Sequence, residues 1–123
     1  MKKNILVVDD SESIRELVGN SLENAGYFVL KGINGKDGVE VLRNFDDNVS
    51  LIITDLFMPE MDGIDLIREV RKDSIYKFVP ILMLTTESQA EKKLEGKKAG
   101  ATGWMVKPFE EGKLLRIVKK VIG

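Results

Sequence analysis

Short apolar runs alternate with longer amphipathic segments along this chain. The runs are rich in Val, Ile and Leu and show little alternation of apolar with polar residues, as in strands whose sheet is covered on both faces. They lie at 4–9, 27–33, 49–55, 79–85 and 103–107. Because α and β segments alternate five times, we expect one α/β domain over residues 1–123, with a parallel sheet and right-handed crossovers.

The segments between these runs carry apolar residues at helical spacing. The first of them places Ile14, Leu17, Val18 and Leu22 on one stripe, and Gly26 is a plausible stop signal. Helices are therefore expected at 12–25, 35–45, 63–73, 88–99 and 110–122.

The helix at 88–99 is expected to hold the least core. Its apolar stripe is thin and consists of Ala90, Leu94 and Ala99. Ser88 and Glu91 predict a capping box at its start. A helix that buries so little surface should be the easiest of the five to move.

The composition excludes several kinds of chemistry. The 123 residues include no cysteine and no histidine, so disulfides, thiolate metal sites and histidine acid–base catalysis are ruled out. Lys and Arg number 19 and Asp and Glu number 20, and this near-neutral balance argues against a nucleic-acid partner. No stretch approaches the ~20 apolar residues of a membrane span. We therefore expect a cytoplasmic protein without a membrane partner.

Polar residues end four of the apolar runs. Asp9 and Asp10 end the first, and Asp55, Thr85 and Lys107 end the third, fourth and fifth. The carboxyl ends of parallel strands meet at one edge of a sheet, where open α/β sheets bind their ligands. We therefore expect three carboxylates, a hydroxyl and an ammonium in one site.

This set suits a divalent cation and a phosphoryl group. Three acids at short range repel each other, and oxygen ligands favour Mg²⁺ or Mn²⁺. Asp10 and Asp55 are the expected direct ligands, and Asp9 is expected to act through water. The Asp55 carboxylate can attack a phosphoryl group, whose charge the cation and Lys107 would stabilise. The Thr85 hydroxyl could donate to a phosphoryl oxygen.

Each part also has a simpler interpretation. The acids at 9 and 10 could cap the following helix, Asp55 could begin the turn at Pro59, and Thr85 is a common strand residue. Lys107 at the end of a buried strand needs an acid partner in either case. The Lys107–Pro108 bond is a candidate cis peptide, and an ordinary trans proline ending the strand is the alternative. Because all five residues lie at the expected carboxyl ends of strands, a shared site is favoured over five separate explanations.

With these residues, the chain resembles the receiver domains of two-component response regulators. Thr54-Asp55-Leu56-Phe57-Met58-Pro59-Glu60-Met61-Asp62-Gly63 is similar to the family's phosphoacceptor segment, and Lys107-Pro108-Phe109 to its cis-proline signature. Asp9 and Asp10 resemble its acidic pair, and Thr85 its switch hydroxyl. The resemblance implies a flavodoxin-like (βα)₅ three-layer sandwich with strand order 2-1-3-4-5. It also implies a Mg²⁺ site completed by the backbone carbonyl of Phe57.

The resemblance further implies a signalling switch that catalyses only its own phosphorylation and dephosphorylation. A histidine kinase of the CheA kind would donate to Asp55, and the signal would leave through the fourth helix, fifth strand and fifth helix. The family's switch aromatic is usually Tyr or Phe, whereas this chain has Trp104, which could also be plain core. Phe57 and Glu87 stand at variable positions beside the site and are expected to tune it.

Two segments, 85–88 and 100–104, resemble chemotaxis regulators of the CheY type. The chain ends directly after the fifth expected helix, so we expect no output domain. We also expect a monomer. It would signal by docking to a flagellar motor switch protein or another target, with a phosphatase as a further partner. Three alternatives stay open: a receiver in a phosphorelay or cell-cycle pathway, a non-catalytic pseudo-receiver, and a haloacid dehalogenase-type phosphatase. The last needs an acid where Ser11 stands.

Overall fold

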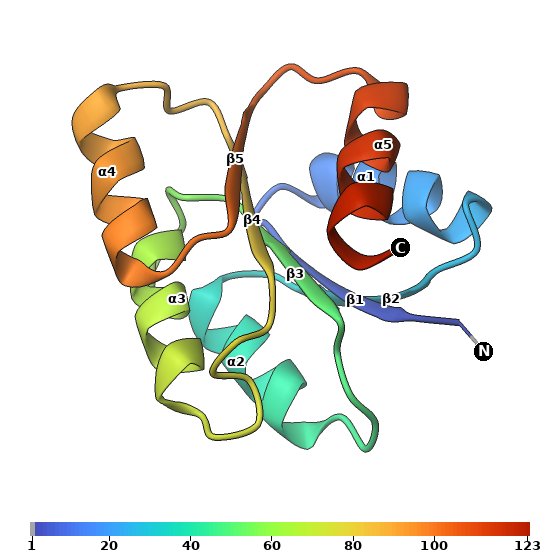
Figure 1. Ribbon diagram of the computed structural model, residues 1–123, viewed down its shortest axis with the longest axis horizontal. Coiled ribbons are helices and arrows are strands. Elements are labelled where there is room, and N and C mark those ends of the chain that lie inside the picture. The colour runs from blue at the N-terminus through green and yellow to red at the C-terminus, as the bar shows by residue number, and fades with distance from the viewer. Residues whose placement is uncertain (1) are drawn as a thin grey trace.

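The computed structural model describes residues 2–123, which form a three-layer α/β sandwich (Figure 1). Its sheet contains five parallel strands in the order β2-β1-β3-β4-β5, as expected. The strands are β1 (Asn4–Val8), β2 (Phe28–Gly32), β3 (Leu51–Thr54), β4 (Ile81–Thr85) and β5 (Gly103–Val106). The helices are α1 (Glu12–Asn24), α2 (Gly35–Asn44), α3 (Gly63–Lys72), α4 (Ala90–Ala99) and α5 (Glu111–Ile122).

The core lies on both faces of the sheet, because successive strand residues point in opposite directions. Ile5 and Val7 of β1 pack in a cluster with residues of α1 and α5, whereas Leu6 and Val8 pack with residues of α2 and α3. Figure 1 shows α1 and α5 on one side of the sheet and α2, α3 and α4 on the other. This double cover explains the continuous apolar runs of the central strands.

The first three helices begin at residues whose side chains accept a backbone hydrogen bond. Ser11 caps α1, Asn34 caps α2 and Asp62 caps α3. The expected stripe of α1 is only partly right, because Leu17 is 52% exposed. No helix within residues 2–123 has the length and apolar character that crossing a bilayer requires.

The start of α4 corrects the prediction of a capping box. The helix begins at Ala90, and its cap residue Gln89 makes no side-chain hydrogen bond to the helix. The carboxylate of Glu87 accepts the backbone N–H groups of Ser88 and Gln89 instead, both at 3.0 Å. The helix therefore starts one residue later than a cap at Ser88 would have placed it.

The buried face of α4 also differs from the expected stripe. Ala90 and Leu94 are exposed, and Gly96 is the buried residue of the helix. A side chain at that glycine would meet the Trp104 ring, because a Cβ atom there would lie 2.9 Å from Cζ3. This helix thus contacts the strand beside it through an indole ring seated on a glycine.

Candidate functional site

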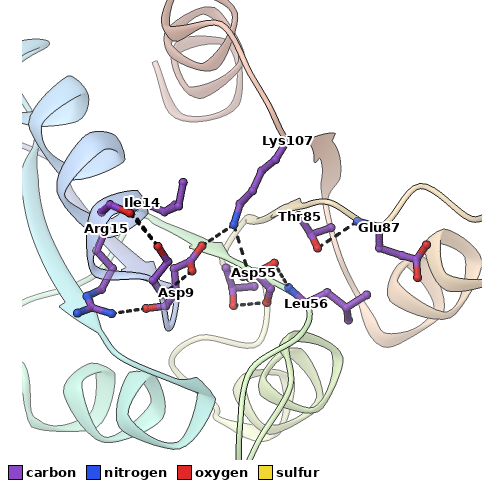
Figure 2. Close-up of polar contacts among 11 residues, drawn as sticks. Asp9, Ile14, Arg15, Asp55, Leu56, Thr85, Glu87 and Lys107 are labelled. Carbon is purple, nitrogen blue, oxygen red and sulfur yellow. Dashed lines mark hydrogen bonds and ion pairs between the residues drawn. The ribbon is translucent and has the colours of Figure 1, made fainter.

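The five polar residues predicted from the strand ends lie together at the carboxyl edge of the sheet. Lys107 reaches across it: its Nζ atom lies 2.8 Å from Asp9 Oδ2 and 3.5 Å from Asp55 Oδ2. Figure 2 shows the ammonium between the two carboxylates, with Thr85 on the far side of Asp55. The lysine therefore has the acid partners that its position after a buried strand requires.

Three carboxylates form the acidic side of the site. Asp9, Asp10 and Asp55 each offer an oxygen, and these oxygens all lie within 4.8 Å of one another. Asp9 is buried, Asp55 is partly buried and Asp10 is exposed, so the cluster opens toward solvent at Asp10. Because every donor is a carboxylate oxygen, the set fits a hard cation such as Mg²⁺ or Mn²⁺.

Backbone and side-chain contacts hold Asp9 in place. Its Oδ1 atom accepts the backbone N–H of Ser11 at 2.9 Å, and its backbone carbonyl accepts Nη1 of Arg15 at 2.6 Å. One carboxylate oxygen of Asp9 therefore bonds to Lys107, and the other bonds to the backbone N–H of Ser11. Arg15 was not predicted as part of the site, because one arginine within an amphipathic helix is most simply a solvated residue.

Asp55 stands at the end of β3 with its carboxylate turned into the site. Its Oδ1 atom accepts the backbone N–H of Leu56 at 2.8 Å. Burial raises the pKa of Asp55 above its usual range, and the Asp9 charge adds to this effect. The Lys107 ammonium, the Thr85 hydroxyl and the Leu56 N–H act in the opposite direction on this pKa. The carboxylate charge is thus only partly compensated by the chain itself.

Thr85 and Trp104 both contact the segment that follows β4. The Thr85 hydroxyl accepts the backbone N–H of Glu87 at 3.3 Å, and the Trp104 indole N–H donates to the Glu87 carbonyl at 2.8 Å. The indole lies partly buried against the core. Glu87 therefore links Thr85 to Trp104, and the Trp104 ring in turn contacts Gly96 of α4.

The other two expected features border this cluster. The Lys107–Pro108 peptide bond is cis. The Phe57 side chain is 53% exposed beside Asp55, so its ring is free to meet solvent or a partner. The metal-binding role of its backbone carbonyl, and the tuning roles of Phe57 and Glu87, stay predictions.

Comparison with known proteins decides the family. A model of the response regulator receiver domain matches residues 5–119. The chain belongs to the response regulator receiver domain family. Its strand order and the acid, hydroxyl and lysine at the strand ends agree with the resemblance expected from the sequence.

Several similar receivers carry chemotaxis names. The chain is 39% identical over 121 residues to chemotaxis protein CheY1 of Helicobacter pylori, covering 97% of this chain and 96% of that protein. It is 37% identical over 120 residues to a CheY homologue of Campylobacter jejuni, covering 97% and 92%. The structure of Vibrio cholerae CheY4 superimposes with a TM-score of 0.93 at 45% identity, covering 98% and 99% of the two chains.

Receivers with other names are also similar. The chain is 43% identical over 114 residues to YrkP, a transcriptional regulatory protein of Bacillus subtilis. That match covers 93% of this chain but 47% of YrkP. The family therefore accounts for the fold and the shared site, and it leaves the output target to be identified by experiment.

Proposed function

We propose that this receiver is a phosphorylation-activated switch whose phosphoacceptor is Asp55. The observation that carries this proposal is the difference between Asp9 and Asp55. Each acid has one oxygen bonded to a backbone N–H, at Ser11 and Leu56. The other Asp9 oxygen lies 2.8 Å from the Lys107 ammonium and the side chain is 4% exposed, whereas the second Asp55 oxygen lies 3.5 Å from that ammonium and the side chain is 13% exposed. Asp55 is thus the better-placed nucleophile, which argues against the phosphatase alternative that requires Asp9.

The proposed step moves a phosphoryl group from a phosphohistidine of a histidine kinase. An Asp55 carboxylate oxygen forms a bond to phosphorus, and the phosphorus–nitrogen bond breaks with its electron pair leaving on the donor imidazole. Bound Mg²⁺ would neutralise charge on the phosphoryl oxygens, and Asp10, Asp55 and the Phe57 carbonyl would hold it directly, with Asp9 acting through water.

The chain's own residues then distinguish the two states. Lys107 can follow the new negative charge on Asp55, and the Thr85 hydroxyl can donate to a phosphoryl oxygen while it still accepts from Glu87. Since Glu87 also accepts from Trp104, a shift of Thr85 changes the environment of the indole and of α4. Phosphorylation would thereby shift a population between two conformations.

Chemotaxis is the pathway we favour, with a CheA-like kinase as donor and a flagellar motor switch protein as target. The support is the set of chemotaxis names among relatives that this chain covers nearly end to end. A receiver in a phosphorelay or cell-cycle pathway would use the same chemistry with another partner. The protein would act in the cytoplasm and turn over no separate substrate.

Acetyl phosphate with Mg²⁺, followed by mass spectrometry, tests the phosphoacceptor. We expect one phosphoryl group on Asp55, none after Mg²⁺ is chelated, and none in Asp55→Asn. Asp46→Asn is the matched control, because Asp46 is an exposed acid in the α2–β3 loop, at the other end of the sheet. Modification at Asp9 would support a phosphatase, and no modification would support a pseudo-receiver.

A binding assay separates the two pathways. The phosphorylated chain should bind a flagellar motor switch peptide more tightly than the unphosphorylated chain does, with Asp55→Asn as the control. If the peptide ignores phosphorylation while a histidine phosphotransfer domain exchanges phosphoryl groups with Asp55, the phosphorelay alternative is correct.

A further inference from the structure

Two large apolar side chains stand exposed at the end of the molecule opposite the acidic site. Phe78 is 87% exposed and Ile75 is 72% exposed, the two highest values among the exposed large hydrophobic residues. Both lie in the α3–β4 loop, at the amino end of β4 (Figure 1). Ile75 and Phe78 line one hollow, and contiguous apolar surface of this kind marks an interaction site.

Hydrogen bonds of Arg71 and Tyr76 hold the loop that carries Ile75 and Phe78. The Arg71 guanidinium donates to the backbone carbonyls of Tyr76 at 3.2 Å and Val79 at 2.6 Å. Tyr76 is buried, and its hydroxyl accepts the backbone N–H of Val49 at 3.2 Å. A partner would therefore meet a preorganised surface and would lose little entropy in ordering this backbone.

Two hollows that differ in charge meet at Ile75, and Phe78 lines the first of them. The first is lined by Lys3, Phe78 and Ile122 among others. The second is lined by Asp46, Asp47 and Asp73, and its one arginine, Arg43, is paired with Glu69 at 3.5 Å. Ile75 lines both hollows.

Lys77 strengthens the basic side, since its ammonium lies 5.8 Å from the centre of the Phe78 ring. We call the whole surface the amino-end patch: basic at Lys3 and Lys77, apolar at Ile75 and Phe78, and acidic at Asp46 and Asp73.

A surface of this kind is complementary to itself. When a second copy is rotated by a half-turn about the apolar centre, its basic side faces the acidic side of the first copy, and the reverse contact forms as well. This is the arrangement of an isologous twofold interface. We propose that the amino-end patch is the contact surface of a symmetric dimer, and that its occupant is a second copy of this chain.

The dimer would be weak and independent of phosphorylation. Two exposed apolar residues per copy cannot approach the apolar content of an obligate interface, so the copies should exchange with the monomer. The acidic sites would lie at the outer ends of the dimer, where kinase and target can reach them. The proposal goes beyond the switch function and departs from the monomer expected from the sequence.

Sedimentation velocity over a range of concentrations tests the proposal. The wild-type chain should show a monomer–dimer equilibrium with a dissociation constant at or below about 1 mM, the weak end of specific association. Phe78→Ser should weaken association at least tenfold. Because this residue is 87% exposed, the variant should fold like the wild type, which circular dichroism checks. Leu94→Ser, which removes an exposed leucine from α4, is the matched control and should dimerise like the wild type.

Charge reversal provides the sharper test. Lys77→Glu and Asp46→Lys should each weaken self-association, because each variant brings like charges together twice across the twofold axis. An equal mixture of the two variants should form a heterodimer, since both contacts are then between opposite charges. A wild-type chain that stays monomeric near ~1 mM, a dimer that depends on Leu94 but not on Phe78, or a mixture that fails to associate would each overturn the proposal.

Discussion

The indole N–H of Trp104 donates a 2.8 Å hydrogen bond to the backbone carbonyl of Glu87. The backbone N–H of Glu87 in turn donates to Thr85 Oγ1 at 3.3 Å. The segment after β4 is therefore held at one residue by the strand-end hydroxyl and by an aromatic residue of β5. Because the Trp104 ring also contacts Gly96, a shift of this segment that moves the ring would also displace α4.

Trp104 is the only tryptophan in the chain, so its fluorescence should report this link. We expect the emission to change when acetyl phosphate and Mg²⁺ are added, since the donor contact to Glu87 is tied to the Thr85 hydroxyl. Asp55→Asn should abolish the change, and Thr85→Ala should reduce it while phosphorylation persists. An unchanged spectrum in the phosphorylated wild-type chain would show that the indole is plain core.

The effect of Gly96→Ala on the free energy of unfolding should depend on the side chain at position 104. Alanine usually stabilises a helix by about 1 kcal/mol relative to glycine. Here its Cβ would lie 2.9 Å from the ring, and overpacking of this kind costs about 1–3 kcal/mol. We expect Gly96→Ala to lower the free energy of unfolding in the wild-type background and to raise it beside Trp104→Phe, which lacks the outer ring carbons.

Urea denaturation of the four chains in this double-mutant cycle measures the coupling. Gly112→Ala in α5 is the matched control, because its Cβ would meet only the flexible end of Arg116 at 3.3 Å. That variant should show the ordinary gain in stability in both backgrounds. Additive effects of Gly96→Ala and Trp104→Phe would contradict the contact.

The raised pKa of Asp55 predicts how stability depends on pH in the absence of Mg²⁺. The folded chain binds the Asp55 proton more tightly than the unfolded chain, whose value lies near 3.8. The stability that comes from this group is therefore complete below the unfolded pKa and is lost as the pH rises through the folded one. Asp55→Asn should lack this loss and should be more stable than the wild type at neutral pH.

Urea denaturation from pH ~4 to ~7 checks this expectation. Mg²⁺ should oppose the loss, because a ligand at a hundredfold excess over its dissociation constant stabilises the folded state by about 2.7 kcal/mol. Chelation should remove that gain, and Asp55→Asn should show a smaller one. A wild type that is more stable than Asp55→Asn without Mg²⁺ would refute the prediction.

Lys107→Met should destabilise the fold by about 3 kcal/mol, because it leaves the Asp9 carboxylate buried without its cation. The Lys107 and Asp9 side chains are 13% and 4% exposed, so solvent cannot replace the lost partner. Thermal unfolding at neutral pH measures the loss. The same substitution beside Asp9→Asn should cost less, and equal costs in the two backgrounds would show that the ion pair contributes nothing.

Phe57→Asn should shorten the lifetime of phosphorylated Asp55. The phenyl ring is 53% exposed beside the site and cannot hold a water molecule by hydrogen bonding, whereas an asparagine amide can. Loss of phosphate after removal of acetyl phosphate measures the rate, and Phe57→Leu is the control for the loss of the ring alone. An unchanged half-life in the asparagine variant would discard this hypothesis.

Local pattern was enough to predict the five strands, the five helices and the residues that end the strands. Apolar runs and stripes report burial directly, because a strand covered on both faces must be apolar throughout and a surface helix on one side only. The carboxyl-edge cluster was predictable for the same reason. Parallel strands all end at one edge, so Asp9, Asp55 and Lys107 were expected at that edge. Their contact also depends on the strand order, which places β1 beside β3 and leaves Lys107 to reach across from β5.

Tertiary packing alone determined the contacts that no local sequence pattern indicates. Arg15 bonds to the carbonyl of Asp9, Gly96 contacts the ring of Trp104, and the Trp104 indole N–H bonds to the carbonyl of Glu87. Each depends on distances across space that residue order does not encode locally. The exposure of Phe78 has the same origin: an apolar residue next to a strand looks like core until the loop that carries it is seen to turn outward.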